Sequence, residues 1–217
     1  MLRTEITVPA VKESSDELNP AVAVLPTEVP APKRRTASDC VALVVASCGV
    51  GYFPLAPGTL GSLVGVGLYL SVSGWFYGLL EANAPGAGLN LPYVPTAQIA
   101  FMLLITFAVT MVGIWAATRT EKVLQRKDPA IVVIDEVAGQ MIALLSGPFW
   151  LHTWWSILSA VILFRLFDIW KPYPIRRLEA LESGLGIMAD DVLAGVYALI
   201  ANSVLIATYL LLPPGPA

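Results

Sequence analysis

Long runs of apolar residues alternate with short polar segments along most of this 217-residue chain. Three runs hold 21 or 22 residues without a charged side chain: Leu60–Leu80, Ala97–Thr118 and Val192–Leu212. About 20 apolar residues suffice for a helix to cross a bilayer, so each run predicts a spanning helix. Two shorter runs, Ile131–Leu145 and Trp154–Trp170, carry charges near one end. We interpret both as spans whose inner ends hold functional groups.

The remaining segments divide the chain into one membrane domain and two tails. Ser38–Tyr52 is apolar but only about 15 residues long, which suits a re-entrant or interfacial helix capped by Ser38 or Asp39. Residues 1–37 are rich in Pro, Ser, Glu and Lys and predict a disordered cytoplasmic tail. We therefore expect an all-α, polytopic membrane protein with about five spanning helices and the short N-terminal helix, in a single domain over residues 38–213. Residues 214–217 form a short C-terminal tail.

Composition and the placement of basic residues support a membrane protein with a defined orientation. The chain is 56% hydrophobic and 13% charged, whereas soluble domains carry about 25% charged residues. All 13 Lys and Arg residues lie in the N-terminal tail, in Arg119–Lys127 or in Arg165–Arg177. Five spans beginning at Leu60 would put these regions on one side, which the positive-inside rule places in the cytoplasm. We expect the lipid bilayer as a partner and no nucleic acid, and no protein partner can be inferred.

Pairs of acidic residues stand at the starts of two apolar runs. Asp135 and Glu136 lie about one turn inside the run Ile131–Leu145, and Asp190 and Asp191 open the run Val192–Leu212. An intramembrane carboxylate costs roughly 2.5–3.5 kcal/mol at a helix centre and less near the ends, so such residues are usually functional. The alternative interpretation is a buried ion pair with Arg165.

A glycine follows each acidic pair at the same spacing. Gly139 stands four residues after Asp135, and Gly195 stands four residues after Asp191. Small residues let neighbouring transmembrane helices approach closely. We therefore expect the two acidic pairs to meet.

A tight turn precedes the first long run, in the sequence P-L-A-P-G-T-L-G-S. We expect this turn to place Thr59 as the N-cap of the helix that follows. Free N–H groups and the positive dipole end of a helix N-terminus favour anions, so Gly58 and Thr59 are candidates for a phosphate seat. The other interpretation is an ordinary helix cap.

The end of the run Trp154–Trp170 carries a second group of candidates. Asp168 and Arg165 are three residues apart and share a helix face. Two prolines stop the helix, and Lys171 and Arg176 then stand at the membrane interface. These two bases serve either to bind phosphate or to anchor the chain.

Clustered carboxylates without His or Cys select a hard cation with oxygen ligands, which favours Mg²⁺. Lys, Arg and a helix N-terminus beside such a cation suit a phosphate group. A carboxylate that is not a ligand serves either as a base or as a nucleophile that attacks phosphorus. His152, the only histidine, lies in a predicted outside loop, which argues against histidine-based catalysis.

Four motifs occur in order between about Val41 and Leu212: P-G-T-L-G-S, I-D-E-V-A-G, F-R-L-F-D-I-W-K-P-Y-P-I-R and G-L-G-I-M-A-D-D-V-L-A-G. Together they resemble the bacterial phosphatidylglycerophosphatase A family. The resemblance implies a Mg²⁺-dependent phosphatase that hydrolyses phosphatidylglycerophosphate, an anionic phospholipid, to phosphatidylglycerol and inorganic phosphate. It also implies the bacterial cytoplasmic (inner) membrane, with the N-terminus and the active site facing the cytoplasm.

The resemblance also assigns roles by motif. Catalytic roles fall to five carboxylates, four of which are candidate metal ligands, and phosphate binding falls to residues of the turn and of the interface. The catalytic set is Asp135, Glu136, Asp168, Asp190 and Asp191, the metal set is Asp135, Glu136, Asp190 and Asp191, and the phosphate set is Gly58, Thr59, Lys171 and Arg176.

Two other functions compete with this interpretation. A membrane phosphotransferase also uses clustered aspartates, but its D-x-x-D-G-x-x-A-R…G-x-x-x-D-x-x-x-D pattern is absent. A small transporter or channel for Mg²⁺ or an anion would line its path with polar residues through the full depth of the membrane. The acids here gather at one face, and the outer halves of the spans hold no charge.

Overall fold

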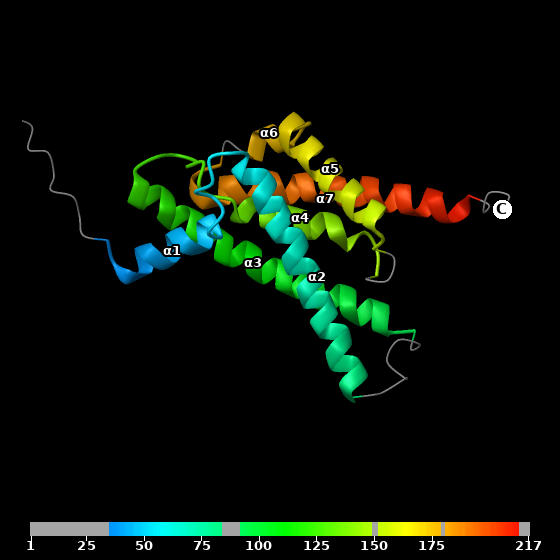
Figure 1. The fold of residues 1–217 in the computed structure, drawn as a ribbon. Coiled ribbons are helices and arrows are strands. Elements are labelled where there is room, and N and C mark those ends of the chain that lie inside the picture. The colour runs from blue at the N-terminus through cyan, green and yellow to red at the C-terminus, as the bar shows by residue number, and fades with distance from the viewer. Residues whose placement is uncertain (1–34, 84–91, 149–151, 179–180, 213–217) are drawn as a thin grey trace, which may run out of the picture. The chain divides into compact units, whose positions relative to one another are not determined.

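The computed structural model describes residues 35–83, 92–148, 152–178 and 181–212. These residues form helices, turns and loops without a strand (Figure 1), so the prediction of an all-α fold is confirmed. Most of the predicted N-terminal tail and all of residues 214–217 lie outside the described residues. The elements are α1 (Ala37–Ser47), α2 (Pro57–Asn83), α3 (Val94–Leu124), α4 (Ile134–Ala143), the 3₁₀ helix η2 (Leu144–Ser146), α5 (Trp154–Trp170), α6 (Ile175–Leu178) and α7 (Ser183–Leu211).

Three described helices, α2, α3 and α7, are long and apolar enough to cross a membrane, fewer than the five predicted. The run Ile131–Leu145 forms α4, which has 10 residues and rises only ~15 Å. It tightens into η2, and Pro148 follows shortly after. α5 keeps its predicted bounds, but its 17 residues rise ~26 Å, less than the ~30 Å of a hydrocarbon core. α4 and α5 are therefore a shorter pair of helices between α3 and α7.

α4 lies at the centre of the helical domain. It packs against α2, α3, α5 and α7, as Figure 1 shows for its position among these helices. Val137, Ala138 and Met141 are at most 1% exposed. Seven of its ten residues are buried, so other helices cover α4 on most sides, and it is the core element that positions whatever its first turn carries.

Two helix starts differ from the predictions. α2 begins at Pro57, because a proline fits the first turn of a helix, where no intrahelical partner for its nitrogen is needed. Thr59 is therefore an exposed residue inside the first turn, and the prediction that it caps the helix is wrong. α7 begins at Ser183, so Asp190 and Asp191 lie inside the helix and do not open it.

The early start of α7 has a packing cause. Glycine disfavours a helix relative to alanine by about 1 kcal/mol, yet Gly184 and Gly186 both lie within α7. A Cβ on Gly184 would strike the Ile114 carbonyl and Thr118 of α3. The absence of a side chain permits this close approach, and contact with α3 stabilises a turn that helix propensity alone would not.

α1 begins at a capping box that the sequence analysis missed. Thr36, and neither Ser38 nor Asp39, is the N-cap, and its hydroxyl accepts a hydrogen bond from the Asp39 N–H at 3.3 Å. In return, the Asp39 carboxylate accepts from the Thr36 N–H at 2.7 Å and from Arg119 Nε of α3 at 2.8 Å. These bonds, the one from the Thr36 backbone first, lower the pKa of Asp39 from 3.8 to about 2. The ion pair attaches the start of α1 to the end of α3.

Replacing Asp39 with Asn is expected to lower the thermal midpoint of the protein near neutral pH. Because the folded-state pKa lies below the unfolded value of 3.8, the carboxylate stabilises the fold above that value and ceases to do so as the pH falls toward about 2. The difference in thermal midpoint between wild type and variant, followed by scanning fluorimetry in detergent, should shrink over that interval. A difference that stays constant from neutral pH to about pH 2 would contradict this origin.

Candidate functional site

All five predicted carboxylates line one cavity of about 250 Å³. The cavity lies where α4 and α7 meet, beside the first residue of α2 and the last turn of α5. Acids from three separate helices therefore converge, as the sequence predicted. The lining residues are Pro57, Asp128, Ala130, Val132, Asp135, Glu136, Asp168, Lys171, Ile187, Asp190 and Asp191.

The first turn of α4 supplies Asp135 and Glu136. Carboxylates are stabilised there by the positive end of the helix dipole and by its free N–H groups. Even so, Asp135 Oδ1 and Glu136 Oε2 are buried without a hydrogen-bond partner among the described residues. A buried polar atom without a partner costs about 1–3 kcal/mol, and more when it is charged. Two such oxygens in one wall indicate a place for a cation.

Asp191 of α7 completes the group. It is 4% exposed, and one carboxylate oxygen from each of Asp135, Glu136 and Asp191 lies within 4.8 Å of the others. The donor set contains oxygen atoms alone, which suits a hard divalent cation and disfavours zinc or copper. The residues present therefore fit a metal ion of this class.

Two glycines bring these acids together. A Cβ on Gly139 of α4 would lie 2.6 Å from the Asp191 carbonyl oxygen, and it would also meet the ring of Phe164. A Cβ on Gly195 of α7 would meet the carbonyl of Gly139. α4 and α7 thus touch backbone to backbone one turn beyond the acids. The close approach predicted from the matched spacing is confirmed.

Asp190 faces a different partner from its neighbour. Lys171 Nζ donates to Asp190 Oδ2 at 2.7 Å, and both side chains line the cavity. Lys171 ends α5 in the left-handed conformation, with φ 46°, and Pro172 prevents the helix from continuing. This sharp ending places the ammonium group of Lys171 inside the site and not at the outer surface.

Arg165 holds the remaining acid. Its Nη1 lies 2.8 Å from Asp168 Oδ2 and 3.8 Å from Glu136 Oε1. The ion pair that the sequence offered as an alternative to a functional site is therefore present. It occupies one side of Glu136, while Glu136 Oε2 remains without a partner, so the ion pair and the acidic cluster coexist.

Comparison with known proteins agrees with these features. The family model described as phosphatidylglycerophosphatase A matches residues 43–206. The chain belongs to the phosphatidylglycerophosphatase A family. It is therefore a phosphatase of lipid metabolism, and its long apolar helices indicate that it acts as a membrane protein.

Three curated relatives are similar over most of their length. A Bacteroides thetaiotaomicron protein named "Putative phosphatidylinositol-3-phosphatase" is 38% identical over 162 residues, 75% of this chain and 91% of the relative. The phosphatidylglycerophosphatase A of Haemophilus influenzae is 35% identical, covering 73% of this chain and 83% of the relative. That of Escherichia coli is 27% identical, covering 71% and 76%. No solved structure matches the chain.

The predicted phosphate-binding residues of this phosphatase are distributed unevenly around the cavity. Gly58 lies against the acids, since a Cβ there would meet Glu136 Oε1 and would lie 2.9 Å from Arg165 Nη1. Lys171 lines the cavity, whereas Thr59 and Arg176 do not. Arg176 lies in a neighbouring pocket that shares Lys171 with the site.

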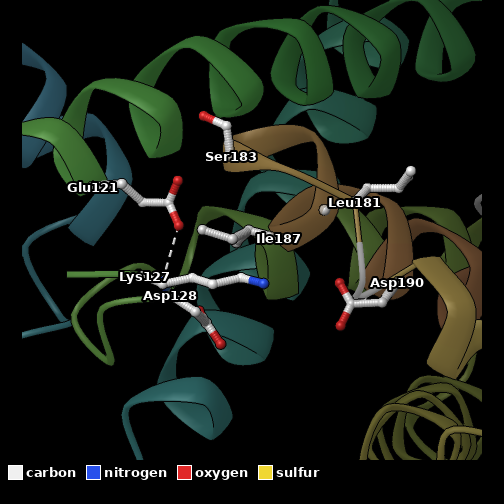
Figure 2. Close-up of a pocket in the computed structure, with 8 residues that line it drawn as sticks. Glu121, Lys127, Asp128, Leu181, Ser183, Ile187 and Asp190 are labelled. Carbon is white, nitrogen blue, oxygen red and sulfur yellow. Dashed lines mark hydrogen bonds between the residues drawn. The ribbon is translucent and has the colours of Figure 1, made fainter.

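Asp128 is a lining residue that the sequence analysis did not single out. It lines both the acidic cavity and an adjoining one of about 310 Å³. Figure 2 shows this second cavity, with the Lys127 side chain extending across it toward Asp190. The loop is held by a hydrogen bond of 3.0 Å from the Asp128 N–H to Glu121. The sequence signal that could have identified Asp128 is its position directly before Pro129 and seven residues before Asp135.

Proposed function

We propose that this phosphatase uses Mg²⁺ to hydrolyse phosphatidylglycerophosphate to phosphatidylglycerol and inorganic phosphate. The observation that carries the proposal is the convergence of Asp135, Glu136 and Asp191, whose oxygens lie within 4.8 Å of one another, in a cavity that also holds Lys171. Three oxygen ligands beside a cationic side chain suit a metal-bound phosphate. The family and the names of two relatives support the lipid substrate.

Asp135, Glu136 and Asp191 would hold the metal. When bound there, Mg²⁺ polarises the phosphoryl oxygens and offsets the charge that develops on them. Asp190, predicted as a fourth ligand, is engaged by Lys171, and we assign it to holding that ammonium group against the phosphate. The N-terminus of α2 at Gly58 lies beside Glu136 and contributes N–H groups of the kind that bind anions.

Hydrolysis adds a water oxygen to phosphorus, breaks the bond from phosphorus to the glycerol oxygen, and delivers a proton to that oxygen. Asp168 and Asp190 are the carboxylates outside the metal-binding trio. Because Lys171 engages Asp190, we assign the reaction to Asp168, which either takes the proton from the attacking water or attacks phosphorus itself to form an acyl-phosphate that water then hydrolyses. Arg165 pairs with Asp168 at 2.8 Å and Lys171 pairs with Asp190 at 2.7 Å, so each basic side chain holds its carboxylate in position.

We place α2, α3 and α7 across the cytoplasmic membrane of a bacterium, with the site on the cytoplasmic side. The Lys and Arg residues lie before α2, between Arg119 near the end of α3 and Lys127, and between Arg165 near the end of α5 and Arg177, which favours that side under the positive-inside rule. A shorter α4–α5 pair returns to the side from which it starts. The smaller number of spanning helices therefore leaves the expected orientation unchanged.

Metal dependence provides the direct test of this function. The purified protein in detergent should release phosphate from phosphatidylglycerophosphate, lose that activity on treatment with a chelator, and regain it when Mg²⁺ is added. Phosphatidylinositol 3-phosphate should be tested in parallel, because one relative is named for that activity. Faster release of phosphate from phosphatidylinositol 3-phosphate than from phosphatidylglycerophosphate would show that the inositol lipid is the preferred substrate and would refute the proposed one.

A transporter or channel is the competing function, and the position of the acids disfavours it. All five predicted carboxylates line one cavity beside the first turn of α4, whereas a conduit needs polar groups through its depth. Flux of Mg²⁺ or phosphate into liposomes, without phosphate release from the lipid, would support the conduit and refute the enzyme function.

A further inference from the structure

A pocket beside the acidic cavity lies at the corner between α5 and α6. Its volume is about 390 Å³, and it is lined by Trp170, Lys171, Pro172, Tyr173 and Arg176. Lys171 also lines the acidic cavity. We call the two pockets the α5–α6 pocket and the acidic cavity. They are neighbours, because both are lined by the Lys171 side chain.

The wall of the α5–α6 pocket is held in place from both sides. The guanidinium of Arg177 lies 4.9 Å from the centre of the Tyr173 ring, within the range of a cation–π contact. The Tyr173 carbonyl accepts a hydrogen bond from the Tyr197 hydroxyl of α7 at 3.1 Å. Lys171 is fixed by its ion pair with Asp190. The pocket is thus attached to the same helix, α7, that carries the acids.

An apolar stripe on α5 leads to this pocket. Leu158, Ile162, Leu166 and Ile169 are spaced four, four and three residues apart, so they share one helix face. They are 50–74% exposed, and Trp170 at the end of the helix is 61% exposed. A membrane protein leaves such a face uncovered toward lipid chains, and exposed aromatic residues mark the level of the headgroups.

Arg176 supplies a charge at the same corner. Its side chain is exposed and forms no hydrogen bond or ion pair with another described residue. A guanidinium can bind two oxygens of a phosphate at once. A phospholipid with a phosphorylated headgroup has two phosphates, a terminal monoester and a diester next to the acyl chains. The α5–α6 pocket has Arg176 beside an otherwise largely apolar lining, and the acidic cavity beyond Lys171 holds the carboxylates, so the order of the two pockets matches the order of the diester and the monoester along the lipid.

We propose that the α5–α6 pocket binds the phosphodiester and glycerol-ester end of the lipid substrate. Arg176 pairs with the diester, Trp170 and Tyr173 contact the glycerol ester, and the acyl chains lie along the apolar stripe of α5. Lys171 stands between the two phosphates, and the monoester enters the acidic cavity. The lipid thus reaches the site sideways from the membrane. This inference rests on the proposed function and adds a binding site for the part of the substrate that does not react.

The test compares three substrates that share a phosphate monoester. Phosphatidylglycerophosphate has the diester and the acyl chains, its deacylated form glycerophosphoglycerophosphate has the diester alone, and glycerol 3-phosphate has neither. Arg176→Gln should reduce kcat/KM for the first two, relative to glycerol 3-phosphate, by roughly tenfold, mainly through KM. Trp170→Ala should reduce severalfold the ratio of kcat/KM for the full lipid to kcat/KM for its deacylated form.

Trp154→Ala is the matched control, because Trp154 stands at the other end of α5 and is 77% exposed. Trp154→Ala should leave two ratios of kcat/KM at their wild-type values: that of the diester substrates to glycerol 3-phosphate, and that of the full lipid to its deacylated form. Equal losses on all three substrates in Arg176→Gln, or equal effects of the two tryptophan variants, would overturn the lipid-binding role while the phosphatase function stands. A wild-type protein that releases phosphate from none of the three substrates would overturn the proposed function, and with it this inference.

Discussion

Replacing Asp191 with Asn should lower kcat/KM for the lipid substrate by roughly a hundredfold or more, while the protein remains folded in the membrane. Loss of a residue that only orients a metal ligand typically costs 10–100-fold, so loss of a ligand should cost at least as much. Asp191 is 4% exposed, and one of its carboxylate oxygens meets oxygens of Asp135 and Glu136 within 4.8 Å. Asn keeps the shape of the side chain but removes its charge. Phosphate release at saturating Mg²⁺ provides the measurement.

Two further variants make this result specific. Asp190→Asn should have a smaller effect, because Asp190 pairs with Lys171 and lies outside the trio of converging oxygens. Glu182→Gln, at the exposed start of the same helix, is the matched control and should keep wild-type turnover. Near-normal activity in Asp191→Asn, with Mg²⁺ dependence unchanged, would refute its assignment as a ligand.

Replacing Gly195 with Ala should cause a large loss of thermal stability. The new Cβ would meet the Gly139 carbonyl and lie 3.0 Å from Gly139 Cα. Backbone atoms cannot give way as a flexible side chain can, so α4 and α7 must separate. Overpacking of this kind costs about 1–3 kcal/mol and occasionally more. The separation should also lower activity, since it moves Asp191 away from Asp135 and Glu136.

Gly67→Ala on α2 is the matched control for this prediction. A Cβ at Gly67 would meet nothing within 4 Å, and Ala favours a helix over Gly by about 1 kcal/mol. The same substitution should therefore raise or preserve the thermal midpoint at position 67 and lower it at position 195. Scanning fluorimetry in detergent, together with phosphate release, measures both effects. Equal shifts at the two positions would show that close packing at Gly195 is not required.

The elements that could be predicted are those with a strong local signal. Apolar runs identify where α2, α3, α5 and α7 lie, because burial in lipid or protein requires continuous apolar surface. Helix ends were harder to predict from the sequence. The start of α7 depends on Gly184 packing against α3, and the start of α2 depends on a proline that no periodic pattern singles out. Boundaries of this kind are set by contacts between helices and not by the residues within them.

The candidate site shows the same division. The cost of carboxylates in an apolar run and the matched Gly139 and Gly195 spacing predicted that the pairs Asp135–Glu136 and Asp190–Asp191 would meet, and the structure brings Asp135, Glu136 and Asp191 together. Neither Asp128 nor the pocket that contains Arg176 could be placed, because both lie in loops or short turns whose position follows from the helices around them. The roles of the individual carboxylates remain proposals for the substitutions above to test.

The sequence by itself determined that this chain is a helical membrane protein and that it is a phosphatase of the phosphatidylglycerophosphatase A family. It did so because hydrophobicity, charge placement and ordered motifs are properties of the chain that need no neighbours. Only the tertiary structure decided that α4 is too short to span, that Asp190 pairs with Lys171 while Asp191 joins the acidic trio, and that Arg176 lies in a separate pocket. Asp190 and Asp191 are adjacent in sequence and line the same cavity, but their carboxylates meet different partners. Their partners are therefore set by what packs on each side of α7.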